Sequence, residues 1–268
     1  MKRRTFLTSS AVSFSAVAGC LGSDENAVEG PDCDGTATTS VSLSDDRDGY
    51  PPAFDQTPEE RDIDTASFDT VEEGGVDVPL APIDVVHHWY KRGEARIADA
   101  RGEKSYGESH IAGAVLSQAS EDRRSSDDPL TEWPKCDRIV CYCGCPHHLS
   151  SVRASQLINQ GYQKVYVIDE GFWAWHDRGY PMGGSNVGDE PKRWVVRGET
   201  DATFAGKNAW ARHRRSGQVE STDITGDGSY ELHLKFHEVG SDSTIEVETP
   251  GYTVEGKLKD LASGTVHE

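Results

Sequence analysis

Apolar residues recur at helical spacing in several segments between residues 78 and 186. In "APIDVVHHWYKRG" the apolar positions are three or four residues apart and Gly93 ends the pattern; they are Ile83, Val86, Trp89 and Tyr90. Short runs rich in Ile, Val and Tyr, which predict strands, are "ARIADAR", "CDRIVCYC" and "KVYVID". Two further helices are expected in "SSVRASQLINQG" and "FWAWHDRG". Strands that alternate with helices indicate an α/β fold, a parallel sheet flanked by helices.

Beyond residue 192 the pattern changes to an alternation of apolar and polar residues. The segments "YELHLKFHEV", "STIEVETPGY" and "TVEGKLKDL" alternate in this way, and "GDGS", "GSDS" and "PG" between them are typical of turns. The alternation predicts a small antiparallel β domain over residues 192–268. Its histidines are scattered and no catalytic constellation is recognisable, so the role of this domain stays open.

Residues 21–77 are dominated by acidic residues, Gly, Pro, Ser and Thr. Their apolar surface is too small to offset the entropy of ordering, so the composition predicts a disordered, flexible acidic tether. Cys33 lies in this tether, within "GPDCDG". Either a free thiol or a disulfide partner fits that position.

Residues 1–20, "MKRRTFLTSSAVSFSAVAGC", begin with a twin arginine and continue with a short apolar run. They resemble a twin-arginine export signal that ends in a lipobox, whose Cys20 would be acylated after cleavage. An ordinary signal cut elsewhere, or a retained N-terminal anchor, is the alternative. No other segment is apolar for long enough to span a bilayer. The sequence therefore predicts an exported lipoprotein, anchored to the outer face of the cell membrane through lipid on Cys20.

Acidic residues outnumber basic ones 46 to 27, which gives a formal net charge of -19. Such a surface repels nucleic acid and anionic membranes, so a nucleic-acid partner is not expected. The acids are spread along the whole chain, as in a surface that stays solvated in high salt. Together with the export pattern, this composition resembles that of haloarchaeal twin-arginine-exported lipoproteins.

The stretch "CYCGCPHHLS" carries the candidate chemistry. Cys143 lies where a buried strand ends and a loop leads into a helix. Backbone N–H groups of such a loop and the positive end of the helix lower the pKa of the thiol and stabilise an anion bound against the sulfur. Cys141, on the strand, is expected to be an inert core thiol. Cys136 has no assignable role.

Four further segments, in chain order, extend the pattern around Cys143 to a resemblance to the rhodanese (thiosulfate sulfurtransferase) family. "IADAR" is similar to the family's strand ending in Asp-x-Arg, with Asp99 and Arg101. "SYGESHIAGA", with His110, is similar to its Glu-Tyr-x-x-Gly-His-Ile-Pro-Gly-Ala segment, and "IVCYC" to the strand that delivers the catalytic cysteine. "DEGFWAWHDRGYP" is similar to its closing Gly-Gly-x-x-x-Trp-x-x-x-Gly-x-Pro. The resemblance covers residues 78–186 only.

The resemblance implies a sulfurtransferase with Cys143 as the catalytic nucleophile. Its thiolate would take the outer sulfur of a small anionic donor such as thiosulfate and carry it as a persulfide, which a thiol, cyanide or sulfite acceptor then removes. No cofactor is implied. Arg101, beside Asp99, could assist electrostatically or be chiefly structural. His110 is expected to be a structural hydrogen-bonding residue rather than a base.

The loop after the cysteine departs from the family's common Cys-x-x-Gly-x-Arg-Ser and is similar to a Cys-x-Cys-Pro variant. The expected loop residues are Gly144, Cys145, Pro146, His147, His148, Leu149, Ser150 and Ser151. Ser150 or Ser151 is expected to cap the following helix, and Ser151 stands two residues later than the family's serine, so the loop is expected to be longer.

Pro146 has no N–H to donate, and the loop has no arginine. His147 and His148 are the only possible cationic replacements, and both would be mostly neutral near neutral pH unless their pKa is raised. These departures put ordinary thiosulfate:cyanide turnover in question.

Other interpretations compete with this one. Some phosphatases share the fold, but their phosphate-clamping arginine is replaced here by Leu149. Cys143, Cys145, His147 and His148 could together bind Zn or Cu. In an oxidising compartment, Cys145 could resolve a persulfide or sulfenate on Cys143 by forming a labile disulfide. A non-catalytic rhodanese-like binding module also stays open, although the retained Cys143 favours catalysis.

Overall fold

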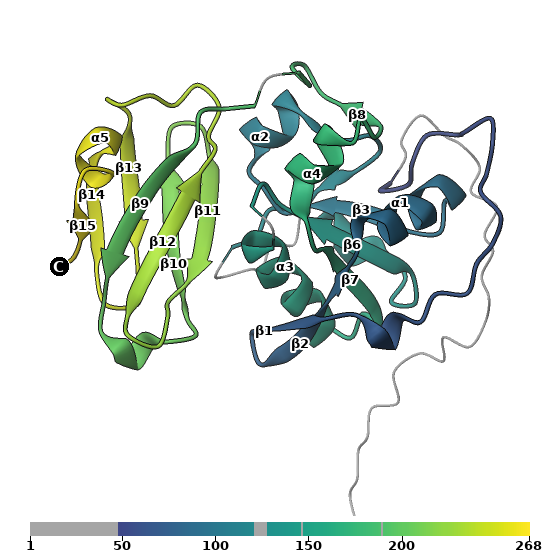
Figure 1. Cartoon of the computed structure of the whole chain (residues 1–268), viewed down its shortest axis with the longest axis horizontal. Helices are drawn as coiled ribbons and strands as arrows, with labels where there is room; N and C mark the ends of the chain where they lie inside the picture. The colour runs from purple at the N-terminus through teal and green to yellow at the C-terminus, as the bar shows by residue number, and fades with distance from the viewer. Residues whose placement is uncertain (1–47, 121–127, 146, 189) are drawn as a thin grey trace, which may run out of the picture. The chain divides into compact units, whose positions relative to one another are not determined.

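Parallel strands form the sheet that the alternating pattern predicts. The structure is a computed structural model that describes residues 48–120, 128–145, 147–188 and 190–268. The strand order of the sheet is β1-β2-β7-β6-β3-β5 (Figure 1), and all neighbours are parallel except β1 and β2. The strands are β1 (Thr70–Glu73), β2 (Val76–Ala81), β3 (Arg96–Asp99), β5 (Val115–Leu116), β6 (Arg138–Tyr142) and β7 (Lys164–Ile168). The α/β fold and the three predicted strands, β3, β6 and β7, are confirmed.

Helices cover both faces of this sheet, because successive side chains of a strand point to opposite sides. Helices α1 (Ile83–Arg92) and α4 (Gly171–Asp177) share one apolar core with the strand residues Ile97, Val140 and Tyr166. Helix α3 (His148–Asn159) shares another with Ala98, Cys141 and Val167. In α1 the four apolar residues of the predicted stripe are buried, and Gly93 ends the helix in the left-handed region at φ 67°.

Short elements complete this part of the chain. Helix α2 (Glu103–Glu108) follows β3, and the strands β4 and β8 pair with each other in a small antiparallel ladder. These strands are β4 (His110–Ile111) and β8 (Met182–Gly183). Two 3-10 helices are η1 (Thr65–Ser67) and η2 (Pro129–Glu132).

The C-terminal alternation forms two further sheets, with the strand orders β11-β10-β13-β14 and β12-β9-β15. All neighbouring strands are antiparallel except β15 and β9, so the antiparallel prediction is confirmed apart from this one pairing. The elements are β9 (Trp194–Glu199), η3 (Ala202–Phe204), β10 (Asn208–His213), β11 (Gln218–Asp223), β12 (Ser229–Leu234), β13 (Thr244–Glu248), β14 (Thr253–Lys257), α5 (Leu258–Leu261) and β15 (Thr265–Val266). We call residues 194–266 the β region. Its own apolar core includes Val196, Leu232, Leu234, Ile245 and Val247.

Residues 48–77 pack against the sheet and its helices, which corrects the prediction of a tether for this part of residues 21–77. The Asp48 carboxylate pairs with Arg96 at 2.5 Å, and the Phe54 ring lies 5.6 Å from that of Tyr90. The few apolar side chains of this acidic stretch have partners in the core, which composition alone does not reveal. Residues 21–47, with Cys33, lie outside the described residues.

A two-residue turn joins β1 to β2 and makes the N-terminal edge of the sheet a hairpin. Glu73 pairs with Val76, and Gly74 and Gly75 between them have φ of 58° and 79°. Two consecutive residues with positive φ are typical of a type I′ turn, which only glycine, asparagine and aspartate adopt readily.

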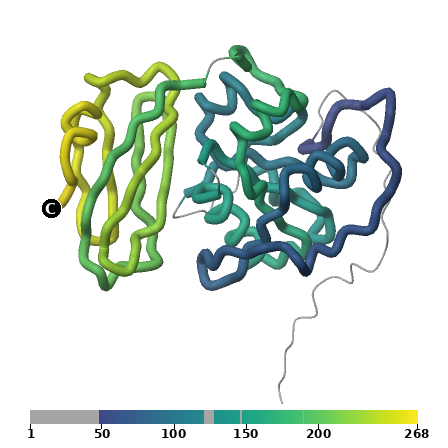
Figure 2. Tube along the Cα trace, viewed as in Figure 1, coloured from purple at the N-terminus to yellow at the C-terminus, as the bar shows by residue number. Residues whose placement is uncertain are grey.

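The described residues between 48 and 268 all belong to one compact unit. Figure 2 shows the course of the chain through this unit to the C-terminus. None of the helices in these described ranges has the length and apolar character needed to cross a membrane. The predicted export signal of residues 1–20 and the predicted lipidation site Cys20 lie outside the described residues. The domain limits at residues 186 and 192 stay predictions.

Candidate active site

Cys143 directly follows β6, and its side chain is fully buried. The thiol donates to the carbonyl oxygen of Cys145 at 3.2 Å, and its sulfur lies 3.2 Å from the sulfur of Cys145 and 3.4 Å from Oγ of Ser150. Backbone N–H groups of Leu149 and Ser150, in the first turn of α3, also bond to the sulfur. The structure thus places Cys143 at the strand–helix junction expected for it.

These contacts decide the charge of the Cys143 sulfur. Burial opposes ionisation, because a thiolate loses its hydration in the protein interior. Hydrogen bonds with the Cys145 and Ser150 side chains and from the two backbone N–H groups act against burial and outweigh it, so the pKa of the Cys143 thiol is lowered. The site therefore favours the thiolate, which is the nucleophilic form of cysteine.

Helix α3 begins earlier than the sequence predicts. Its N-cap residue is His147, whose side chain makes no capping hydrogen bond, and the backbone N–H of Ser151 donates to the His147 carbonyl oxygen at 2.8 Å. The expected serine cap is therefore wrong: Ser150 and Ser151 lie inside the first turn and are buried. The Ser150 hydroxyl contacts the Cys143 sulfur instead of a backbone N–H at the helix end. Pro146 lies outside the described residues.

Cys145 connects the loop to the β region. It is 8% exposed, and its thiol donates to Oε1 of Glu220, on β11, at 3.2 Å. The hydrogen bond with Cys143, burial and the neighbouring Glu220 all raise the pKa of Cys145 well above its ordinary value. The two thiols in contact therefore differ in character: Cys143 favours the thiolate and Cys145 holds its proton.

Glu220 is a buried acid, 5% exposed, whose carboxyl also accepts the backbone N–H of Ser221 at 3.1 Å. Burial is the main cause that raises the pKa of Glu220 to about 8, and the nearby Cys143 adds to it. Glu220 is not among the site residues expected from the sequence. It lies in "QVESTD", a polar strand without alternation, so no local pattern marks it as buried.

Apolar side chains of the β region complete the surroundings of the two cysteines. Trp210, on β10, and Val219, on β11, belong to one buried cluster with Cys143 and Cys145. Trp210 is 1% exposed. The β region therefore contributes buried apolar side chains to the cluster that contains the Cys143 sulfur, which its sequence pattern did not indicate.

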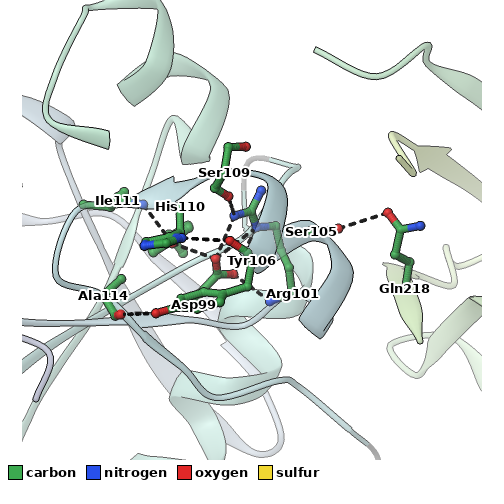
Figure 3. Close-up of polar contacts among 10 residues, drawn as sticks. Asp99, Arg101, Ser105, Tyr106, Ser109, His110, Ile111, Ala114 and Gln218 are labelled. Atoms are coloured by element: carbon green, nitrogen blue, oxygen red, sulfur yellow. Dashed lines mark hydrogen bonds and ion pairs between the residues drawn. The ribbon is translucent and has the colours of Figure 1, made fainter. Parts of the chain in front are cut away.

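Arg101 and Asp99 form a buried ion pair at the end of β3 (Figure 3). The guanidinium donates to both carboxylate oxygens at 2.7 to 3.3 Å and to the Ser109 carbonyl oxygen at 2.6 Å, and it lies 3.8 Å from the centre of the Phe172 ring. The Tyr142 hydroxyl donates to the same carboxylate at 2.6 Å. The pair ties β3 to β6, α4 and the segment before β4, so it holds the elements that position the loop.

His110 belongs to this framework and not to the set of groups around Cys143. Its ring stacks on Tyr106 with centroids 4.2 Å apart, and Nδ1 lies 2.8 Å from the Tyr106 carbonyl oxygen (Figure 3). The same figure shows Ser105, on α2, donating to Oε1 of Gln218, on β11, at 3.2 Å. Helix α2 is thus a second point at which the β region is hydrogen-bonded to the α/β part.

Burial lowers the pKa of the loop histidine His148, which favours its neutral form. The rings of His147 and His148 are 6.0 Å apart. In the described ranges, no three His, Cys, Asp or Glu side chains are grouped closely enough to hold a metal ion. Cys143, Cys145, His147 and His148 are therefore not brought together as the four-ligand set considered above.

Comparisons with known proteins agree with this geometry. The family described as "Rhodanese-like domain" matches residues 83–178. Thiosulfate sulfurtransferase GlpE of Vibrio cholerae is 32% identical over 95 residues, 33% of this chain and 79% of that protein. The protein of the same name from Shewanella oneidensis is 36% identical over 93 residues, 31% of this chain and 76% of that protein. The chain belongs to the rhodanese-like family.

Two solved structures are similar to the rhodanese-like domain at lower identity. The BH2092 protein of Bacillus halodurans has a TM-score of 0.35 and 20% identity, covering 39% of this chain and 76% of that one. A thiosulfate sulfurtransferase of Pseudomonas aeruginosa has a TM-score of 0.34 and 21% identity, covering 40% of this chain and 20% of that one.

Neither Leu149 nor Arg153 offers a group that could clamp a phosphate beside Cys143. Leu149 is fully buried in the cluster that contains Cys143. Arg153, one turn further along α3, is turned to Asp128 and Ser117. Of the other cysteines, Cys141 is buried in the core as expected, and Cys136, to which the sequence assigned no role, is disulfide-bonded.

Proposed function

We propose that this protein is a sulfurtransferase that carries sulfane sulfur as a persulfide on Cys143. The observation that carries the proposal is the position of the Cys143 sulfur, at the end of β6, against the N–H groups of Leu149 and Ser150. Donors in this arrangement stabilise both a thiolate and the terminal sulfur anion of a persulfide. The names of the Vibrio and Shewanella relatives, both thiosulfate sulfurtransferases, support the same chemistry.

The reaction has two half-reactions with one covalent intermediate. In the first, the Cys143 thiolate attacks the outer sulfur of thiosulfate, the sulfur–sulfur bond of the donor breaks, and sulfite leaves with the bonding electron pair. In the second, an acceptor thiolate or cyanide attacks the outer sulfur of the persulfide and takes it away. The Cys143 thiolate leaves and is ready for another donor.

A donor anion meets a different set of groups here from the arginine of the common family loop. The Trp173 indole N–H, 9% exposed, has no hydrogen-bond partner among the described residues, and a Cβ built on Gly144 would lie 3.8 Å from it. Lys235 of the β region places its ammonium 5.1 Å from the centre of the Trp173 ring. We assign recognition of the anionic donor to these groups rather than to His147 and His148.

Donor access requires a movement of the chain, because Cys143 is fully buried. We infer that the cover consists of Trp210 and Val219, which share the buried cluster of Cys143 and lie on two neighbouring strands of one sheet. A displacement of these strands would uncover the sulfur while β6 and α3 keep their places. The β region would then regulate when the thiolate meets its donor.

The test is a stoichiometric reaction of the reduced protein with thiosulfate. We expect one equivalent of sulfite per chain from the wild type, released as the persulfide forms. The Cys143→Ser variant should release no sulfite and take up no sulfur, whereas Cys145→Ser should release sulfite and carry, by intact mass, one added sulfur atom. An adduct that survives in Cys143→Ser would move the nucleophile to Cys145, and no sulfite from the wild type would favour a binding module.

We also propose that the protein is exported and held at the outer face of the membrane by lipid on Cys20. The twin arginine and the lipobox of residues 1–20 support this proposal. Sulfur donors and acceptors would then be those found outside the cytoplasm.

A further inference from the structure

Three reactive groups are in successive contact at the centre of the site. The sulfur of Cys145 lies 3.2 Å from the sulfur of Cys143 and 3.2 Å from Oε1 of Glu220. All three side chains are buried, and Glu220 comes from β11, beyond the residues 83–178 that match the family. Sulfur transfer to an external acceptor makes and breaks bonds at Cys143 alone, so it gives Cys145 no covalent step and leaves Glu220 without a role.

We propose that Cys145, with Glu220 as its base, resolves the persulfide inside the protein and releases sulfide. This step rests on the proposed function, because it starts from the persulfide on Cys143. Cys145 attacks the inner sulfur, which is the Cys143 sulfur that it already contacts. The bond between the inner and outer sulfur atoms breaks, the outer sulfur leaves as hydrosulfide, and a disulfide joins Cys143 to Cys145.

Atoms and electrons balance without an external oxidant. Attack by Cys145 gives up one thiol proton, which Glu220 accepts and passes to the departing sulfide. The sulfane sulfur gains two electrons and the two cysteine sulfurs lose them. A dithiol reductant is then needed to return the protein to its starting state. A disulfide in a Cys-x-Cys ring is strained, so it should exchange readily with such a dithiol.

The surroundings of Glu220 suit it to act as the base that removes the proton of the Cys145 thiol. The Cys145 thiol points at the carboxyl, and the charged groups that act on Glu220 are Cys143, which raises its pKa, and Arg101, which lowers it. A base with a pKa of about 8 is close in strength to the operating pH, where general base catalysis is most effective. Sulfide release should therefore become faster as the pH rises through about 8, because the free carboxylate becomes more abundant.

The experiment is a single turnover of fully reduced protein with thiosulfate, in the absence of added thiol. Sulfite reports persulfide formation, and sulfide, trapped with a fluorescent bimane, reports resolution. In the wild type we expect one sulfide for each sulfite. Alkylation followed by intact mass should show that Cys143 and Cys145 have become resistant to the reagent until a dithiol is added.

Two variants test the release of sulfide separately from the formation of the persulfide. Cys145→Ser should load sulfur and hold it, with sulfite but no sulfide. Glu220→Gln should release sulfide about a hundredfold more slowly, the size of effect usual for loss of a general base, and lose the rise through pH 8. Glu220→Asp should recover part of the rate. The matched control is Glu246→Gln, which removes another buried glutamate of the β region and should leave both products unchanged.

The outcomes separate the two proposals. Sulfite without sulfide in the wild type, or sulfide at the wild-type rate from Cys145→Ser, overturns internal resolution and leaves sulfur transfer in place. An unchanged rate and pH profile in a folded Glu220→Gln overturns the role of the base. Absence of sulfite from the wild type overturns the proposed function itself, and internal resolution with it.

Discussion

Replacement of Arg101 by alanine tests whether this residue acts on substrate or on the fold. The variant removes three hydrogen bonds with Asp99, the bond to the Ser109 carbonyl oxygen and the contact with the Phe172 ring. It leaves the Asp99 carboxylate fully buried, with the Tyr142 hydroxyl and the Arg101 backbone N–H as its remaining donors. The perturbation is thus a buried charge that has lost its counter-charge.

Loss of one partner from a buried ion pair destabilises proteins by about 3–5 kcal/mol. For a chain of this size each kcal/mol lowers the melting temperature by about 2–4 °C, so a decrease of roughly 10 °C is expected. A second change, Asp99→Asn, should recover part of the loss, because it removes the uncompensated charge. Arg178→Ala is the control, since Arg178 pairs with Asp84 at 2.6 Å on the surface and should contribute less than about 1 kcal/mol.

Urea unfolding followed by tryptophan fluorescence gives the free energy, and sulfite release below the transition gives the chemistry of the folded fraction. We expect the folded Arg101→Ala protein to form the persulfide within a factor of about three of wild type, because the guanidinium is engaged with Asp99 and not with the sulfur. An undiminished stability would refute the structural role. Normal stability together with lost sulfite release would make Arg101 a catalytic residue.

Three further predictions concern the cover, the buried acid and the anchor. Trp210→Ala should increase the rate at which iodoacetamide labels Cys143 by about tenfold, because displacement of the cover becomes easier by about 1.4 kcal/mol. The control is Trp133→Ala, which removes an equally buried ring from another core and should leave the labelling rate unchanged. Equal labelling rates in both variants would contradict a local cover. The fold raises the pKa of Glu220 to about 8, so its protonated form stabilises the protein below about pH 5 and this contribution is lost as the pH rises through 8. Glu220→Gln should therefore gain about 4 kcal/mol relative to wild type between pH 5 and pH 9 in urea titrations, and a difference independent of pH would count against the shift. Cys20→Ala should abolish incorporation of a labelled lipid precursor in cells, and persistent labelling would place the anchor elsewhere.

The α/β part of the fold could be predicted because its rules are local. Helical spacing from Ile83 to Tyr90 and the Gly93 stop define α1, and apolar runs define β3, β6 and β7. The hairpin of β1 and β2 was not predicted, since acidic composition was given more weight than the pair Gly74–Gly75. That dipeptide between short alternating runs is itself a hairpin pattern, so the hairpin could have been found.

The candidate site, too, could be predicted from the sequence only in part. Cys143 could be placed because a strand, a loop and a helix follow one another along the chain. Glu220 could not, since its contact with Cys145 joins residues 75 positions apart and its strand shows no apolar alternation. The serine cap failed for a related reason: the Ser150 hydroxyl contacts a sulfur that is seven residues away in sequence and near only in space.

The cover over Cys143 also determines what steady-state kinetics would measure. A donor can react only with molecules whose cover is displaced, so at high donor concentration the turnover rate approaches the rate constant of that displacement. Saturation curves for chemically different donors would then share one plateau, set by the strands β10 and β11 and independent of the strength of the sulfur–sulfur bond that breaks. A common plateau would be a property of the β region, although the bond that forms is made by the rhodanese-like domain.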